Sequence, residues 1–341
     1  MSAKGTDVTE SRTQIDPATI PGSGSTHPWA HPWAAWKAIL TRVYTMVGYH
    51  NLTLMAAGVA FYAFLSIVPM LGAIVMTYGL VADTATVARH MQTIFELVPA
   101  DAARLISDQL IAVVTTASRQ AGLGLVIALL LAVYGAMRAA SAIIQALNVI
   151  YEEEDERSIV TTTLLSAMIT LAAIFAVIVG IVSAGVLTWL QSAVAFLGTA
   201  GAVMIQIVTW GVAGAITSAG IAFAYRYGPD RTRAQWRWLS VGSVAATILW
   251  LLATVGFGVY AANFANYNAT YGALGAVVVL LMWLFVSSLA ILIGAEINAE
   301  AERQTAIDST VGHPRPMGHR GARLADTLPS KRQLKPRRGA Y

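Results

Sequence analysis

Two ionisable residues border long uncharged tracts of the sequence. Glu296 follows residues 238–295, which contain no Asp, Glu, Lys or Arg, and Arg138 ends an uncharged run that begins at Gln120. Because a charge inside a membrane span costs about 2.5–3.5 kcal/mol on insertion scales, both are functional candidates. Glu296 is either a carboxylate that binds a proton or a cation, or an ordinary acid at a helix end. Arg138 either extends its side chain to the membrane surface or binds an anion. We predict that the two form an ion pair.

Five residues without charge are further candidates. Asn298 lies two positions after the glutamate. Ser66 and Pro69 leave a gap in the backbone hydrogen bonds of one helix, which either lines a substrate path or is a packing kink. Asn148 and Gln206 are expected to hydrogen-bond across helices, and Gln206, in mid-span, is the more costly to leave unpaired.

Patterns typical of enzymes are missing from the sequence. It contains no cysteine, and it lacks the P-loop, GxSxG and HExxH spacings. The acidic cluster at 152–156 is the densest group of carboxylates, and we interpret it as a solvated face. We therefore predict no enzymatic activity, no catalytic or metal-binding residue and no cofactor.

Composition predicts an all-α, polytopic membrane helix bundle. Hydrophobic residues make up 56% of the 341 residues and charged residues only 12%, with a mean hydropathy of +0.62. Such a chain needs about 20 apolar residues per helix to cross a bilayer, and irregular backbone cannot face lipid. We expect a transmembrane domain at 34–303, with an amphipathic extramembrane helical pair at 83–119 between the first two spans. Its six spans are expected near residues 53–81, 120–138, 159–190, 201–225, 238–262 and 273–296.

The distribution of basic residues predicts the orientation. Nineteen of the 22 Lys and Arg residues fall in the two termini and in the connections on the same side as the termini. Short connections rich in Lys and Arg stay in the cytoplasm. We therefore expect a multi-pass membrane protein with its N- and C-termini cytoplasmic.

The two ends of the chain have compositions typical of disorder. Residues 1–33 are rich in Ser, Thr, Gly and Pro, and residues 304–341 are rich in Pro, Gly and basic residues. We predict a disordered arm and a disordered basic tail that attracts anionic lipid headgroups. Specific nucleic-acid binding is not expected, because no reader motif accompanies the charge.

Three segments resemble one bacterial family. They are NLTLMAAGVAFYAFLSIVPMLG at 51–72, ALNVIY at 146–151 and YGALGAVVVLLMWLFVSSLAILIGAEINAE at 271–300. Their pattern is similar to the YihY and virulence factor BrkB family of inner-membrane proteins, some of which have carried the label ribonuclease BN. The resemblance covers roughly residues 34–303 and implies an integral plasma-membrane protein with about six helices.

The resemblance brings no catalytic residues with it. Roles suggested for the family include serum resistance and movement of envelope lipids or solutes. We expect transport or translocation of an envelope lipid or an amphipathic solute, with membrane lipids as partners. Two alternatives stay open, a membrane scaffold that does not transport and a membrane-bound ribonuclease.

Overall fold

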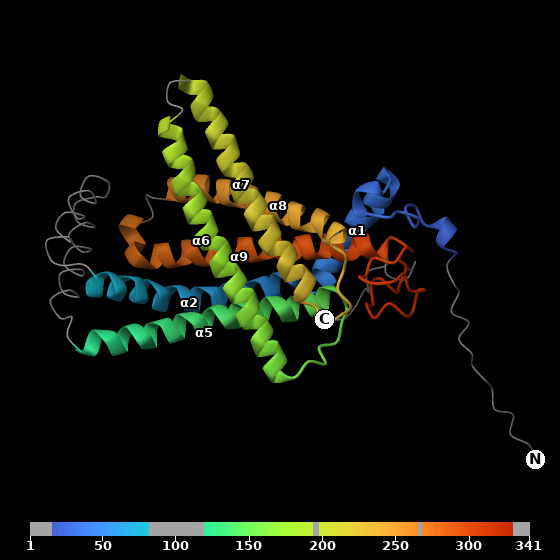
Figure 1. The fold of residues 1–341 in the computed structure, drawn as a ribbon, viewed down its shortest axis with the longest axis horizontal. Helices are drawn as coiled ribbons and strands as arrows, with labels where there is room; N and C mark the ends of the chain where they lie inside the picture. The colour runs from blue at the N-terminus through green and yellow to red at the C-terminus, as the bar shows by residue number, and fades with distance from the viewer. Residues whose placement is uncertain (1–15, 82–118, 194–197, 265–267, 330–341) are drawn as a thin grey trace, which may run out of the picture.

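The computed structural model describes residues 16–81, 119–193, 198–264 and 268–329 (Figure 1). Over these ranges the chain forms seven α-helices and two short 3-10 helices, and no strand. The all-α prediction is confirmed, while the amphipathic pair expected at 83–119 lies almost wholly outside the described residues. The α-helices are α1 (Trp33–Tyr49), α2 (Leu52–Val81), α5 (Arg119–Ile150), α6 (Ile159–Ala193), α7 (Gly198–Tyr227), α8 (Trp236–Phe264) and α9 (Asn268–Arg303).

The long helices fit the thickness of a bilayer. From α2 onward each α-helix has 29 to 36 residues, and at 1.5 Å per residue each exceeds a hydrocarbon core of about 30 Å. In the described residues, α5 to α9 are long and apolar enough to span, and α1 with the first part of α2, bent by 64°, gives a sixth candidate. The prediction of about six spans is confirmed.

Large apolar side chains cover the outside of the bundle. Leu130, Leu171 and Leu252, on three different helices, are each more than 60% exposed. A water-soluble protein rarely presents contiguous apolar surface on this scale. These faces are therefore suited to contact lipid chains.

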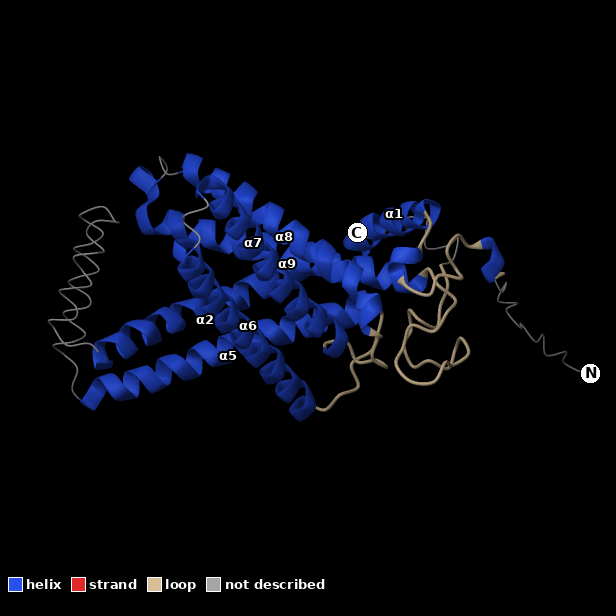
Figure 2. Cartoon of the chain, turned by 45° about the horizontal axis from the view of Figure 1, so that its top comes forward, coloured by secondary structure: helices blue, strands red, loops and turns tan. Residues whose placement is uncertain are grey.

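The spans are arranged as neighbouring hairpins. Helix α2 packs along α5 and α9, α8 packs along α9, and α7 packs against both α6 and α8. In Figure 1 the α6–α7 hairpin crosses the other spans at a steep angle. In Figure 2 the loops drawn in tan, which belong to the described residues, gather at one end of the molecule, which we call the base. The base comprises α1, the connections 151–158 and 228–235, the end of α9 and residues 304–329.

The buried core is concentrated at the base. Its largest cluster joins α2, α5, α7, α8 and α9, and also takes in Leu324 from beyond the last helix. Figure 1 shows the connections near α1 and the end of α9. The base is therefore the most tightly packed part of the described structure.

Residues 16–33, beside the base, and residues 304–329, within it, are structured, which corrects the expectation of disorder for these two segments. In the first segment Ser25 and His31 are buried, and Thr305 Oγ1 donates to the carbonyls of Ser23 and Ser25. In the second, Arg320 is 4% exposed and donates to the carbonyls of Ala306 and Ala325, at 2.6 Å each. The prediction of disorder from composition failed here because charged side chains such as Arg320 bind backbone carbonyls instead of water. Residues 1–15 and 330–341 lie outside the described residues.

Candidate functional site

The end of α9 buries an unusual density of charge. Glu296, Glu300, Glu302 and Arg303 are each at most 2% exposed. Charged residues are almost never fully buried unless they are paired. The partners of these four residues come from α1, the α1–α2 junction and both connections at the base.

One chain of ion pairs runs from α1 to the connection after α5. Arg42 Nε lies 2.5 Å from Glu300 Oε2, and Arg42 Nη2 donates to Gln304 Oε1 at 2.6 Å. The other oxygen of Glu300 accepts from Arg303 at 3.0 Å, and Arg303 also binds Glu152. Each carboxylate or guanidinium in the chain thus has an opposite charge beside it.

A second pair ties the connection between α7 and α8 to α9. Arg231 donates to both oxygens of Glu302, at 2.5 and 2.8 Å, and its guanidinium stacks 5.0 Å from the ring centre of Tyr151. Burial alone would lower the pKa of Arg231, but the charge and hydrogen bonds of Glu302 outweigh it and hold that pKa above its usual value. Burial also raises the pKa of the Tyr151 hydroxyl. Arg231 therefore stays charged and paired.

A third pair joins His50 to Glu296. His50 Nδ1 lies 3.0 Å from Glu296 Oε2, and the two side chains are 5% and 0% exposed. Glu296 Oε1 is buried and has no hydrogen-bond partner among the described residues. This carboxylate thus has a titratable partner where the other buried glutamates have arginines.

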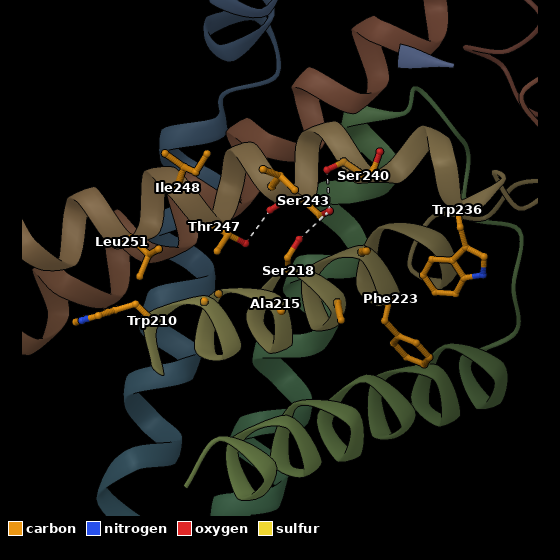
Figure 3. Close-up of a pocket in the computed structure, with 15 residues that line it drawn as sticks. Trp210, Ala215, Ser218, Phe223, Trp236, Ser240, Ser243, Thr247, Ile248 and Leu251 are labelled. Atoms are coloured by element: carbon orange, nitrogen blue, oxygen red, sulfur yellow. Dashed lines mark hydrogen bonds between the residues drawn. The ribbon is translucent and has the colours of Figure 1, made fainter. Parts of the chain in front are cut away.

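A groove lies between α7 and α8, with a cavity volume of about 800 Å³. Figure 3 shows that the side chains lining it come from both helices, with Trp210 near one end and Trp236 near the other. Small residues of α7 leave the space, among them Gly211, Gly214 and Ala215. A volume of this size lies within the usual range for small-molecule sites.

Hydroxyl groups run along one side of the groove. Ser218 Oγ donates to Ser243 Oγ at 3.2 Å, and Thr247 Oγ1 donates to the Ser243 carbonyl at 2.8 Å (Figure 3). The remaining lining is mostly apolar. The groove therefore offers an apolar surface with a narrow polar track, which suits an amphipathic molecule.

Arginine and aromatic side chains lie near Trp236, which lines the groove at its base end. The guanidinium of Arg226 lies 4.6 Å from the ring centre of Trp236, and that of Arg233 lies 5.0 Å from the ring centre of Tyr227. Arg226 also donates to the Ala234 carbonyl at 2.6 Å, but its Nε is buried with no partner among the described residues. Aromatic rings and arginines of this kind are typical of a membrane–water boundary.

Sequence comparison agrees with this membrane architecture. Residues 43–317 match the family described as virulence factor BrkB. The chain belongs to the virulence factor BrkB family. The earlier resemblance is therefore confirmed, and no solved structure matches this chain.

Curated relatives of this BrkB family protein carry two kinds of name. The putative ribonuclease-like protein YfkH of Bacillus subtilis is 31% identical over 193 residues, which cover 54% of this chain and 68% of YfkH. A UPF0761 membrane protein of Alteromonas mediterranea is 27% identical over 253 residues, 72% of this chain and 81% of the relative. One from Tolumonas auensis is 36% identical over 84 residues, 25% of this chain and 28% of the relative.

The predicted pairing of Arg138 with Glu296 is wrong. The guanidinium of Arg138 lies on the exposed side of α5, 5.2 Å from the ring centre of Tyr62 on α2. Glu296 is held instead by His50. The two side chains do not meet, because Arg138 points outward from α5 whereas Glu296 is buried.

Two predicted asparagines make the hydrogen bonds that hold the base of this BrkB family protein together. Asn298 Oδ1 accepts from the Gly242 N–H at 2.7 Å, and its Nδ2 donates to the Leu239 carbonyl at 3.1 Å. Asn148 donates to Asp155 at 3.0 Å and accepts from the Asp230 N–H at 2.8 Å. Asn298 therefore joins α9 to α8, and Asn148 joins the two connections at the base.

The other predicted polar residues have local roles. Ser66 Oγ donates to the Ala63 carbonyl at 2.7 Å, and α2 continues as a helix through Pro69. A Cβ on Gly135 would lie 2.9 Å from Ser66 Cα, so α2 and α5 are in backbone contact here. Gln206 is exposed on α7, and its side chain makes no hydrogen bond to another helix among the described residues.

His50, Arg42 and Arg231 are the site residues that sequence reasoning missed. Arg42 and Arg231 were interpreted only as signals of topology, although both are buried in ion pairs. His50 belongs to no motif that the sequence contains. The signal that could have found them is the four ionisable residues at 296–303, which need partners if that helix end is buried. Among the described residues, no three His, Asp or Glu side chains are placed to hold a metal ion.

Proposed function

We propose that this protein binds an anionic membrane lipid in the α7–α8 groove and moves it across the bilayer. The groove is the observation that carries the proposal, because it combines an apolar lining, a track of hydroxyls and a basic mouth within the membrane-embedded part of a BrkB family protein. The acyl chains lie among the small residues of α7, and the headgroup follows the hydroxyls of Ser218, Ser243 and Thr247.

Charge complementarity supports an anionic headgroup. Arg226, Arg233 and Arg237 lie at the base end of the groove, and the latter two are exposed. The unpartnered Nε of Arg226 is a donor for a phosphate oxygen once the side chain moves from Trp236. A guanidinium matches the geometry of a phosphate better than an ammonium does.

The proposal also includes an orientation. The base carries the connections and terminal segments that hold most of the basic residues of the chain. Under the positive-inside rule the base faces the cytoplasm of a bacterial inner membrane. The proposed mouth then meets the lipids of the cytoplasmic leaflet.

A lipid translocation assay tests the proposal. The purified chain is reconstituted in vesicles that contain fluorescent phosphatidylglycerol, and a membrane-impermeant quencher reports lipid that reaches the outer leaflet. Gly211→Leu fills the groove, and Gly220→Leu is its matched control on the same helix, because a Cβ at either position meets nothing within 4 Å but only Gly211 lines the groove.

We expect translocation above that of empty vesicles for the natural chain and for Gly220→Leu, and loss of at least tenfold for Gly211→Leu. The proposal would be contradicted if vesicles with the protein moved lipid no faster than vesicles without it. This comparison is made in both directions across the bilayer, with and without an ion gradient. Equal rates for the two leucine variants would show that lipid does not use the groove.

A further inference from the structure

The buried charges at the base balance one another except at His50 and Glu296. The guanidinium groups of three arginines face the carboxylates of three glutamates in the ion pairs described above. These six residues are Arg42, Arg231, Arg303, Glu152, Glu300 and Glu302. Glu296 has no arginine, so its charge is balanced only when the imidazole of His50 carries a proton.

The groups around Glu296 leave little else to neutralise it. On α9 itself, Glu300 repels a second negative charge, and Arg303 is already bound to Glu300 and Glu152. From α1, Arg42 is bound to Glu300. The Tyr151 hydroxyl follows the end of α5, α7 brings Tyr225, which donates to the Ile291 carbonyl, and α8 brings backbone groups that bind Asn298.

Glu296 Oε1 and the Tyr151 hydroxyl are among the buried polar atoms of the base that have no hydrogen-bond partner in the described residues. Their side chains are 0% and 1% exposed. A buried carboxylate oxygen that accepts no hydrogen bond is costly when the group is ionised. A proton on Oε1 removes that charge, so the free oxygen is a place for a proton to bind.

His50 also lies at the bend between α1 and α2. It is the C-cap of α1, and Asn51, which follows with φ of 52°, begins the bend of 64° into α2. The contact of His50 with Glu296 therefore holds this elbow against α9 beside the Arg42–Glu300 ion pair. A change in the charge of the pair acts directly on the bend.

We propose that His50 and Glu296 form a proton-binding site that controls the position of the α1–α2 elbow. In the resting state the pair shares one proton, as imidazolium and carboxylate. A second proton, taken from water at the base, forms an O–H bond at Glu296 Oε1. The imidazolium then faces a neutral carboxylic acid, the ion-pair attraction is lost, and the elbow separates from α9. The site does not depend on the proposed lipid transport.

Infrared difference spectroscopy tests the proton directly. The chain is held in nanodiscs of phosphatidylglycerol and phosphatidylcholine while the pH is lowered, and the carbonyl band of a protonated carboxylic acid is followed. We expect a band that is lost in Glu296→Gln and kept in Glu154→Gln, which changes an exposed glutamate of the connection after α5. In His50→Gln the band should appear at higher pH, because no imidazolium holds the carboxylate ionised.

Spin labels test the movement, since the chain has no cysteine to remove. Labels at Tyr44→Cys on α1 and Val149→Cys on α5 use side chains that are 85% and 39% exposed. We expect the distance distribution to shift as the pH falls, and the labelled Glu296→Gln chain to show the shifted distribution at neutral pH. A carboxyl band that survives in Glu296→Gln would overturn the proposal. So would a label distance that ignores pH, or one that responds to sodium at fixed pH. None of these outcomes bears on lipid translocation.

Discussion

Gly242 on α8 and Gly294 on α9 bring the backbones of two spans into direct contact. A Cβ on Gly294 would lie 2.5 Å from the Gly242 carbonyl oxygen, and a Cβ on Gly242 would overlap the Gly294 carbonyl oxygen. Asn298 binds α8 one helical turn further along α9. The crossing thus depends on two residues without side chains and one buried amide, and small residues at such contacts are typical of membrane helices.

Alanine at Gly242 is expected to destabilise this crossing. Overpacking costs about 1–3 kcal/mol, and here the obstruction is backbone that cannot rotate away. Gly258→Ala, on the same helix, is the control, because a Cβ there meets nothing within 4 Å. Thermal unfolding in detergent should show a lower Tm for Gly242→Ala only. Equal Tm values for the two variants would mean that α8 and α9 are not in backbone contact.

Asn298→Ala should cost about 1–3 kcal/mol of stability, since it leaves two buried backbone groups without their side-chain partner. The matched control is Gln206→Ala, which removes an exposed amide from a span. Denaturant unfolding in mixed micelles compares the two. A loss for Gln206→Ala as large as that for Asn298→Ala would contradict the assignment of Asn298 as the residue that joins α8 and α9.

The pair of Arg231 with Glu302 should behave as a unit. Removing one partner of a buried ion pair costs about 3–5 kcal/mol because it leaves an unpaired charge, whereas apolar replacement of both is often neutral. We expect Arg231→Met and Glu302→Leu each to destabilise the chain strongly, and the double variant to recover much of the loss. Additive losses in a double-mutant cycle would show that the two side chains do not interact.

Docking of residues 16–32 on the base should weaken in mild acid. His31 Nε2 lies 3.1 Å from the Ala301 carbonyl oxygen, and Nδ1 is buried without a described partner, so burial lowers the pKa of His31. Because the released histidine binds a proton more readily than the docked one, the docked state is favoured above the ordinary pKa of about 6.5 and loses stability as the pH falls below it.

Hydrogen exchange of this segment at several pH values measures the effect. Exchange should rise below pH ~6.5 in the natural chain and in His27→Gln, which changes an exposed neighbour. In His31→Gln the rise with acid should be absent. A rise of the same size in His31→Gln would place the pH sensitivity in another group.

Helix positions were predictable from sequence because they depend on local hydropathy. Each predicted span lies within an observed helix, as 159–190 does within Ile159–Ala193. The partners of buried charges were not predictable in this way. His50 and Glu296 are 246 positions apart, and only the packing of α9 against the α1–α2 elbow brings them together.

The groove between α7 and α8 could not be predicted from sequence either, for a different reason. Small residues four positions apart, such as Gly211 and Ala215, indicate from sequence only that two helices can approach closely. Whether the space beside these small residues is filled or stays open depends on the side chains of the neighbouring helix. Here α8 presents Ser243, Val244 and Thr247, which are too short to fill the space.

Photocrosslinking of lipid to α7 and α8 is the most direct test of the central claim, that an anionic lipid occupies the groove. The chain is reconstituted with phosphatidylglycerol that carries a photoreactive group in its acyl chain, irradiated, digested and mapped by mass spectrometry. We predict adducts concentrated on groove residues such as Ala215 and Thr247, reduced by excess unlabelled phosphatidylglycerol and by Gly211→Leu. Adducts spread evenly over the exposed faces of α5 and α6, and unaffected by competitor, would contradict it.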